Sequence, residues 1–316
     1  MTVLAFYDLA VSPVSFDMMA YLIAAKHFAG SDNLHVVIVP GPNEGFKAQD
    51  HKPISHAEKV WRVAHVLVPL CTMVGATVTT LHNREDARTF SCPRMYPEGY
   101  SVDRPVAAHF LTRAQRAMLA GAVPHFAASE RATEHVQKWI RRERNLVSLT
   151  IRDTHTVMRN SNFATWHEVA FQLEKRGYAP VFVPDTAMMT RHVGEGFLMF
   201  PLAACDLDIR AALYDACVMN MAASGGPFAL TYLGATRPYL YFHNTFPERF
   251  LTDPKDGDLQ FHQTAEYLTK MGWPPGSQLP FAGQRRRTVW ANDDDPDFIM
   301  KEFDGAMVEN HAENVA

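Results

Sequence analysis

A turn of small residues, Ser224-Gly225-Gly226-Pro227, stands between an apolar run and a stretch with helical spacing. Glycine has no side chain, so it lets the backbone come close to a ligand. The start of a helix then offers unpaired backbone N–H groups to an anion. These residue types could hold a phosphate group, although the same turn could also join a strand to a helix and bind nothing.

Basic and polar residues follow two further apolar runs in the same half of the chain. In an open parallel sheet, ligands bind outside the carboxyl ends of the strands, and the sequence places these residues there. Arginine forks, backbone N–H groups and a helix dipole together would suit a pyrophosphate. Asn162 could equally cap a helix, and Arg159 could be a surface charge. Besides the turn, the candidate residues are Arg152, Asp153, Arg159, Asn160, Asn162 and Asp185.

The elements that would position these residues alternate between strands and helices. In the first half, an apolar run over 2–10 leads to a helix that ends at Gly30, and a β-rich run over 34–40 follows. A connection of this kind requires parallel strands. A helix from Ser55 and a strand over 76–83 continue the pattern, while residues 84–128 are the least regular apart from a helix near 112–120.

The second half repeats the pattern more clearly, with five strands predicted between helices. Two Rossmann-like domains facing across a cleft are the simplest architecture in the α/β class that accounts for this alternation. We expect an N-terminal domain over 1–140, a C-terminal domain over 141–285, and a crossover helix with an acidic tail over 286–316. The three consecutive arginines within 284–290 are expected on a solvated face. The five strands are predicted at 146–151, 180–185, 196–203, 217–222 and 238–243.

Composition favours a soluble globular protein, with 47% hydrophobic and 20% charged residues in a chain of 316. The net charge of −4 does not suggest a nucleic-acid partner, and the acidic residues after position 290 are expected to form a solvated end. The four cysteines form no CxxC pair and predict buried thiols in a reducing compartment. The first residues do not resemble a signal peptide, so we expect a cytoplasmic protein.

Two segments of the second half resemble a known family. "LYDACVMNMAASGGPFALTYLGATRPYLYF" is similar to the nucleotide-sugar segment of GT-B glycosyltransferases, especially the heptosyltransferase-like group. "VSLTIRDTHTVMRNSNFATWHEVAFQLEKRGYAPVFVPD" is similar to the opening of the same domain, and its Arg152-Asp153 pair resembles the arginine-centred motif of fucosyltransferase-like enzymes. The resemblance covers about residues 145–245. No lysine of this half precedes Trp166, and Ser-Gly-Gly-Pro replaces the usual Asp-Thr-Gly-Pro.

The resemblance implies a transferase that moves a sugar from a nucleotide-diphosphate donor to a glycan or glycoconjugate acceptor. Gly225, Gly226 and the helix after Pro227 would hold the diphosphate, and Arg152 would neutralise the leaving group, without a metal and without a further cofactor. The N-terminal domain would supply a carboxylate base, for which Asp17 is the first candidate and Asp8 the rival. A lipid-linked acceptor would bring the protein to a membrane surface.

Four other functions fit parts of the sequence. A sugar-nucleotide epimerase could share the same two-domain shape, and a catalytically silent nucleotide-sugar-binding protein could share the same pocket. An α/β-hydrolase could use Ser224 as its nucleophile with Asp258 and His262, although the first glycine of its motif is missing. A metal-dependent GT-A transferase could use the Asp-x-Asp pairs at 206–208 and 256–258.

Overall fold

The computed structural model describes residues 1–48, 54–140, 145–154, 160–223, 225–243 and 265–307. The chain divides into two units, Met1–Phe126 and Ala127–Ala316, and each is described by itself. We had expected the first boundary at residue 140. The structure places helix α5 (Glu130–Ile140) in the second unit, because its apolar face packs on the core of that unit.

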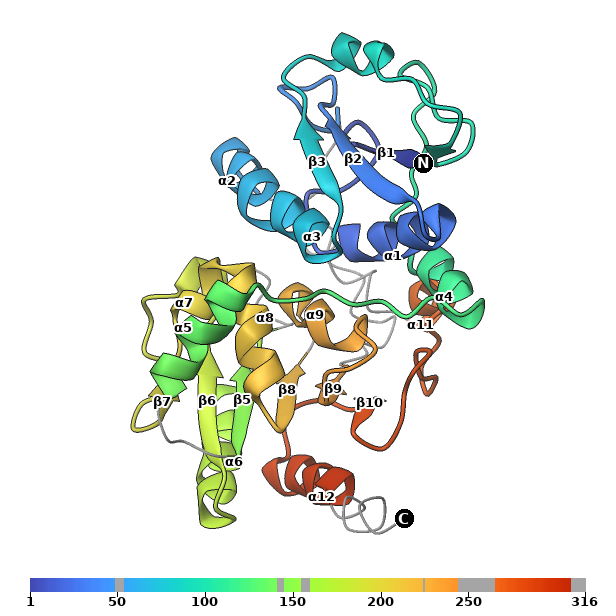
Figure 1. The fold of residues 1–316 in the computed structure, drawn as a ribbon. Helices are drawn as coiled ribbons and strands as arrows, with labels where there is room; N and C mark the ends of the chain where they lie inside the picture. Colours follow the sequence, from blue (N-terminus) through green and yellow to red (C-terminus); the bar gives the residue numbers. More distant parts are fainter. Residues whose placement is uncertain (49–53, 141–144, 155–159, 224, 244–264, 308–316) are drawn as a thin grey trace. The chain divides into compact units, whose positions relative to one another are not determined.

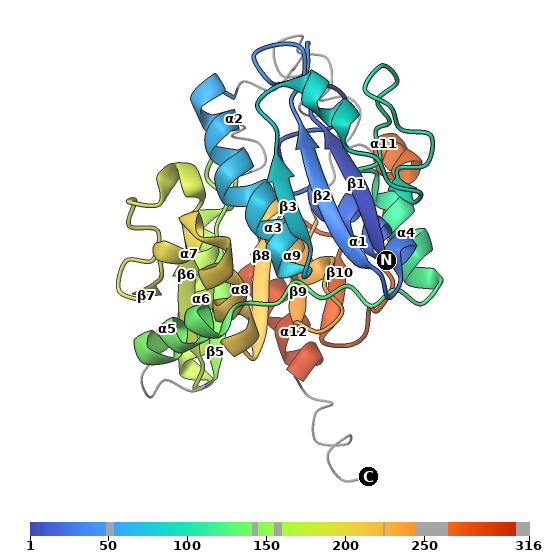
Figure 2. The same cartoon turned by 45° about the horizontal axis from the view of Figure 1, so that its top comes forward.

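The first unit is built on a four-stranded parallel sheet in the order β3-β2-β1-β4. Six of the seven residues of β1 are buried, as is usual for a parallel strand that is covered on both faces. Figure 2 shows β1 and β2 in front of the helix α1. The elements of this unit are β1 (Thr2–Asp8), α1 (Met18–Ala29), β2 (Asn33–Val39), α2 (His56–Arg62), α3 (Val68–Met73), β3 (Thr77–Thr80), β4 (Met95–Tyr96) and α4 (Leu111–Leu119).

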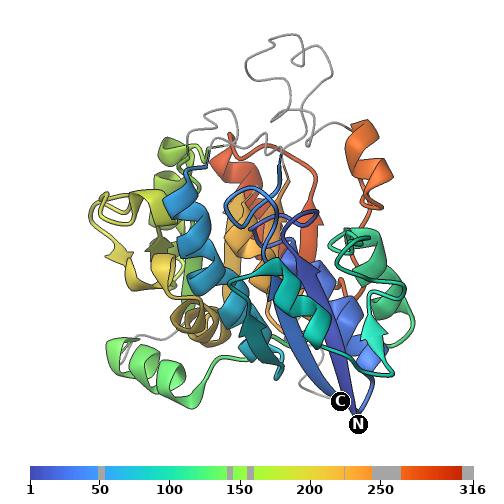
Figure 3. The ribbon, with the colours of Figure 1, turned by 90° about the horizontal axis from the view of Figure 1, so that it is seen from above.

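The opposite face of this sheet is covered by irregular chain, which the sequence pattern left undefined. A 3-10 turn over Arg84–Thr89 lies over β1 and β2 (Figure 3), and side chains from the segment after it pack on the sheet. Tyr100 stacks on Phe6 with their ring centroids 4.4 Å apart. This irregular segment therefore covers the face of the sheet that a second layer of helices covers in a regular doubly wound fold.

The second unit contains a six-stranded parallel sheet in the order β10-β9-β8-β5-β6-β7 (Figure 1). All five predicted strands are present, although the one predicted over 196–203 is only two residues long. The structure adds β10, in which Thr288 and Val289 are buried. The three arginines that we had expected on a solvated face are only partly exposed. The strands are β5 (Leu146–Thr150), β6 (Ala179–Val183), β7 (Leu198–Met199), β8 (Met219–Ala223), β9 (Tyr239–Phe242) and β10 (Arg286–Val289).

Helices cover both faces of this sheet. On one face, α6 and α12 pack together with apolar side chains of the strands, and on the other face α5, α7 and α8 do so. Together with α5, the helices are α6 (Phe163–Lys175), α7 (Leu202–Cys205), α8 (Leu207–Ala216), α9 (Ala229–Tyr232), α11 (Ala265–Lys270) and α12 (Pro296–Met307). Helix α12 thus belongs to the second unit, where we had expected a helix that crosses back to the first domain.

The segment that leads into α12 is not simply a solvated acidic end. Asp293 is buried, and its Oδ2 accepts hydrogen bonds from the indole Nε1 of Trp166 at 2.8 Å and from the backbone N–H of Asn162 at 3.0 Å. A buried carboxylate is stable when hydrogen-bond donors satisfy it in this way. Asp293 therefore ties the chain before α12 to the start of α6.

None of the helices in the described part of the chain is long and apolar enough to cross a membrane. The stretch over 63–83 has no Asp, Glu, Lys or Arg and contains a π-helical turn (Val63–Leu67), α3 and the partly exposed edge strand β3. The four cysteines are free thiols, of which Cys71 and Cys217 are buried and Cys92 and Cys205 are partly exposed.

Candidate functional site

The register of the second sheet brings the predicted site segments together. Thr150 of β5 is paired with Val183 of β6 on one side and with Ala222 of β8 on the other. Since the three strands are parallel and aligned, the segments that follow them start at the same edge. Arg152, Asp185 and the glycine turn are therefore neighbours, as the sequence predicted.

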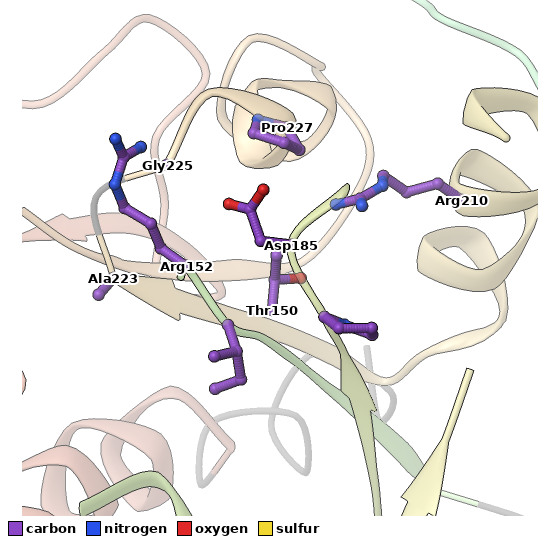
Figure 4. A pocket seen from close by; sticks show the side chains of 9 residues that line it. Thr150, Arg152, Asp185, Arg210, Ala223, Gly225 and Pro227 are labelled. Atoms are coloured by element: carbon purple, nitrogen blue, oxygen red, sulfur yellow. The ribbon is translucent and has the colours of Figure 1, made fainter. Parts of the chain in front are cut away.

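A small pocket lies at this edge (Figure 4). Its volume is about 10 Å³, which is room for about one water molecule or one oxygen atom of a ligand. Four of the predicted residues line it, and five others complete it. The lining residues are Thr150, Ile151, Arg152, Pro184, Asp185, Arg210, Ala223, Gly225 and Pro227.

Gly225 is not required by the backbone or by packing. Its φ of −154° is an extended conformation that any residue adopts, and a Cβ atom there would lie 3.7 Å from the carbonyl oxygen of Ala223, an ordinary contact. The space beside Gly225 therefore faces the pocket instead of being filled by protein. Ser224, the first residue of the turn, lies outside the described residues.

The helix after the turn is shorter than expected. A 3-10 turn over Gly226–Phe228 leads into α9, which has only four residues, where we had expected a helix to follow Pro227. A helix this short sums few peptide dipoles, so the dipole contribution that we expected for the anion site is small. Positive charge at this edge comes mainly from side chains.

Hydrogen bonds join the two described ends of the segment between Arg152 and Ser161. The backbone N–H of Arg152 donates to Ser161 Oγ at 2.9 Å, and the N–H of Ser161 donates back to the Arg152 carbonyl at 2.9 Å. The side chain of Asn160 accepts from the N–H of Thr154 and donates to its carbonyl, both at 2.9 Å. Asn160 thus fixes the loop that presents Arg152, while Arg159 lies outside the described residues.

Two of the predicted contact residues bind other parts of the protein. Asp153 is buried and forms an ion pair with Arg191. Asn162 caps α6, with its side-chain oxygen accepting from the N–H of Thr165 at 3.4 Å. Neither residue lines the pocket. In this structure Asn162 is a helix cap and Asp153 pairs with the exposed Arg191, while a contact of either residue with nucleotide or sugar stays a prediction.

Asp185 does line the pocket. It follows β6, and Figure 4 shows its carboxylate between the guanidinium groups of Arg152 and Arg210, below Pro227. A carboxylate in this position accepts hydrogen bonds from hydroxyl groups. The pocket therefore combines two cations with one acceptor.

Arg210 and Thr150 were missed by the sequence analysis. Arg210 lies on α8, far in sequence from the strand ends that guided our search, and is only 1% exposed. A single arginine on the apolar side of the stretch "LDIRAALYDA" was the available signal. Long charged residues are almost never fully buried without a partner. An arginine on the apolar side of a helix is therefore a candidate site residue.

The two candidate bases of the first unit differ in their surroundings. Asp8 is fully buried, and its carboxylate accepts from both terminal nitrogens of Arg84, at 2.7 and 2.9 Å, and from the Tyr100 hydroxyl at 2.9 Å. The hydrogen bond to Asp8 raises the pKa of Arg84, and burial together with the nearby Asp8 raises that of Tyr100. These contacts give Asp8 a structural role.

Asp17, by contrast, is exposed at the start of α1. Its side chain makes no capping hydrogen bond to the helix, although it holds the N-cap position, and it accepts a hydrogen bond of 2.6 Å from the Ser15 hydroxyl. An exposed carboxylate that does not cap its helix is accessible to a substrate. Asp17 remains the candidate base.

The Asp-x-Asp pair at 206–208 is occupied by protein contacts. Asp206 caps α8 by accepting from the N–H groups of Asp208 and Ile209. Asp208 accepts from the backbone and the hydroxyl of Ser129. Across the described ranges, no three His, Cys, Asp or Glu side chains form a group that could hold a metal ion. Asp258 and His262, which the hydrolase alternative needs, lie outside those ranges, as does the second pair at 256–258.

Comparison with known proteins gives a likeness in structure but not in sequence. No protein-family model matches the chain, and no curated protein matches it. The structure of Escherichia coli ADP-heptose LPS heptosyltransferase II is similar with a TM-score of 0.51 at 13% identity, covering 98% of this chain and 100% of that one. A family 9 glycosyl transferase from Veillonella parvula gives a TM-score of 0.48 at 13% identity, covering 98% and 97% of the two chains.

The first of these likenesses confirms the α/β fold with two parallel sheets, as in GT-B heptosyltransferases. The resemblance to the heptosyltransferase-like group thus holds at the level of the fold. The similarity of the Arg152-Asp153 pair to fucosyltransferase-like enzymes gains no support from these structures.

Proposed function

We propose that the protein is a glycosyltransferase that moves a hexosyl, deoxyhexosyl or heptosyl group from a nucleotide-diphosphate donor to a glycan or glycoconjugate acceptor. The observation that carries this proposal is the pocket at the carboxyl edge of the second sheet. There, Arg152, Arg210 and the Gly225 turn converge in a fold shared with a heptosyltransferase. A cytoplasmic place in polysaccharide synthesis, with a lipid-linked acceptor at the membrane surface, is part of the same proposal.

In the proposed reaction, the bond between the sugar C1 and the donor diphosphate breaks while the acceptor oxygen bonds to C1. Negative charge grows on the departing diphosphate, and Arg152 would stabilise it without a metal, since fixed cationic donors in a site shielded from water act strongly on developing charge. Asp17 would take the proton of the acceptor hydroxyl. Asp185 would accept hydrogen bonds from hydroxyls of the sugar or the ribose.

Thermal unfolding in the presence of a panel of nucleoside diphosphates tests the proposal. A ligand at 100 times its Kd stabilises the folded state by about 2.7 kcal/mol, so the cognate diphosphate is expected to raise Tm clearly. The matching nucleoside without phosphates is the control and should have no comparable effect. An unchanged Tm across the whole panel would contradict the proposal. If a nucleoside diphosphate binds but no nucleotide sugar is consumed when acceptor extracts are added, the result would favour the catalytically silent binding protein.

A further inference from the structure

A buried arginine with an unsatisfied nitrogen lies beside the pocket. The guanidinium of Arg210 donates from Nε to the carbonyl of Ala203 at 2.6 Å and from Nη1 to the hydroxyl of Tyr214 at 3.2 Å. Its Nη2 is buried and has no hydrogen-bond partner among the described residues. Both of its bonds thus go to uncharged groups, and one donor is left over.

A second buried arginine in the same unit shows the usual arrangement. Arg237 is 3% exposed and forms two hydrogen bonds with the carboxylate of Asp215, at 2.7 and 2.9 Å, and a third with the carbonyl of Leu230. Removing a cation from water is costly unless an anion or a full set of acceptors replaces the water. Asp185 lines the same pocket, but among the described residues no hydrogen bond or ion pair joins it to Arg210. Arg210 therefore has less compensation than Arg237, and an anion from outside the described residues would complete it.

The position of Arg210 limits where that anion can bind. Its side chain reaches in from α8 and lines the pocket opposite Arg152 (Figure 4). Tyr214, which accepts from Nη1, is also hydrogen-bonded at 2.7 Å to Thr150, and Thr150 lines the same pocket. The guanidinium is therefore held by α7 and α8, and the Tyr214 hydroxyl that it contacts is held in turn by Thr150 of β5.

We propose that the pocket receives one oxygen of a phosphate group and that Arg210 Nη2 donates a hydrogen bond to it. The proposal rests on the proposed function, because the phosphate would belong to the donor diphosphate. The volume of about 10 Å³ has room for one such oxygen, and the rest of the diphosphate would extend outward from it. Arg210 is then a binding residue for the phosphate, and Arg152 supplies the second cation.

Titration calorimetry with inorganic phosphate, inorganic diphosphate and the cognate nucleoside diphosphate tests this assignment. We expect Arg210→Met to weaken diphosphate binding at least tenfold, because it removes a charged donor from the site. Arg210→Lys keeps the positive charge but loses the planar guanidinium, so its affinity for diphosphate should lie between those of the wild type and Arg210→Met. The matched control is Arg237→Met, a change of the same kind at a buried arginine outside the pocket, which should lower stability and leave diphosphate binding unchanged.

The outcomes separate this inference from the proposed function. Equal diphosphate affinity in wild type and Arg210→Met overturns the role of Arg210 and leaves the proposed function standing. The wild type could bind inorganic phosphate and diphosphate, lose both in Arg210→Met, and bind no nucleoside diphosphate. That result would overturn the proposed glycosyltransferase function and keep the role of Arg210 in phosphate binding. If no phosphate compound binds the wild type, both are wrong. If Arg210→Met does not fold, a crystal structure of the wild type with diphosphate decides: a phosphate oxygen next to Arg210 Nη2 supports the inference, and one bound elsewhere overturns it.

Discussion

At the scale of single residues, the two carboxylates of the first unit show how burial separates structure from chemistry. Asp8 is the last residue of β1, and Asp17 follows the strand nine residues later. Asp8 is fully buried in an ion pair with Arg84, and Asp17 is exposed. We predict that Asp17→Asn lowers turnover at least about 100-fold, the usual contribution of a general base, with donor binding and stability unchanged. The measurement is the initial rate of sugar transfer beside calorimetric donor binding.

Asp8→Asn is the matched comparison, with the same chemical change nine residues earlier in the chain. It is expected to lower the free energy of unfolding by about 3 kcal/mol, as when one partner of a buried ion pair is removed. Denaturant titration measures this loss. If Asp17→Asn transfers sugar at the wild-type rate, Asp17 is not the base; if Asp8→Asn is as stable as wild type, the ion pair with Arg84 is not structural.

Gly225 gives the second prediction at this scale. A Cβ atom there makes only an ordinary contact, 3.7 Å from the carbonyl oxygen of Ala223, and would project beside the pocket. We therefore expect Gly225→Val to keep the wild-type circular dichroism spectrum and to weaken nucleoside-diphosphate binding at least tenfold. Gly283→Val is the control, since a Cβ atom at Gly283 has nothing within 4 Å and Gly283 does not line the pocket. Unchanged binding in Gly225→Val would mean that the turn only connects β8 to α9.

The four thiols give a prediction about the order in which they react. Burial raises the pKa of Cys71 and of Cys217 to about 12. At pH 8 such a thiol holds on the order of a thousandfold less thiolate than an ordinary one, and the thiolate is the reactive form. We expect the partly exposed Cys92 and Cys205 to react with a disulfide reagent first, and the other two only on unfolding. Four equally fast thiols in the native protein would contradict the burial of Cys71 and Cys217.

The site residues show what the sequence could predict at this scale. Arg152, Asp185 and Gly225 follow strand ends, and strand ends are readable from apolar runs. Asp153 and Asn162 follow β5, as Arg152 does, yet their side chains bind within the protein. The sequence could not predict this, because it does not give the direction of a loop side chain. Arg210 was missed because a helical arginine is expected on the solvent face, and only the packing of α8 buries it.

At the scale of elements, apolar runs predicted five of the six strands of the second sheet, and the sixth, β10, was missed for a physical reason. The strand β10 was missed because arginines occupy its first half, and these are compatible with an edge strand where the alternate faces are partly open. Helix α12 was placed correctly in sequence, but its partner could not be read from periodicity. Its apolar face packs on α6, where Ile299, Phe303 and Trp166 share one core.

This packing predicts a large effect of a single truncation. Phe303 is fully buried in the core between α12 and the sheet. Phe303→Ala should lower the free energy of unfolding by about 3 to 5 kcal/mol, from lost burial and the cavity that remains. Phe171→Ala on α6 is the control, since Phe171 is 47% exposed, and should change it by much less. Equal effects in denaturant titrations would show that α12 does not stabilise this core.

At the scale of the whole molecule, the pocket belongs to one unit only. All nine lining residues lie between Thr150 and Pro227, within the second unit, whereas Asp17 belongs to the first. We predict that a fragment of residues 127–316 binds the cognate nucleoside diphosphate within a few-fold of the full chain and transfers no sugar. Calorimetry and a transfer assay measure both. A fragment that folds cooperatively and binds no diphosphate would show that the first unit contributes to donor binding.

The strand order also has a consequence for how the protein is made. The central strand β5 pairs with β8, and Ser148 and Asn220, which face each other there, are 72 positions apart. At a synthesis rate of about 5 to 20 residues per second, β5 waits on the order of ten seconds for this neighbour. During that time the backbone edge of β5 that later pairs with β8 is open to other nascent chains. Slower translation or higher expression temperature should therefore increase the fraction of newly made protein that aggregates, even where the finished molecule is stable.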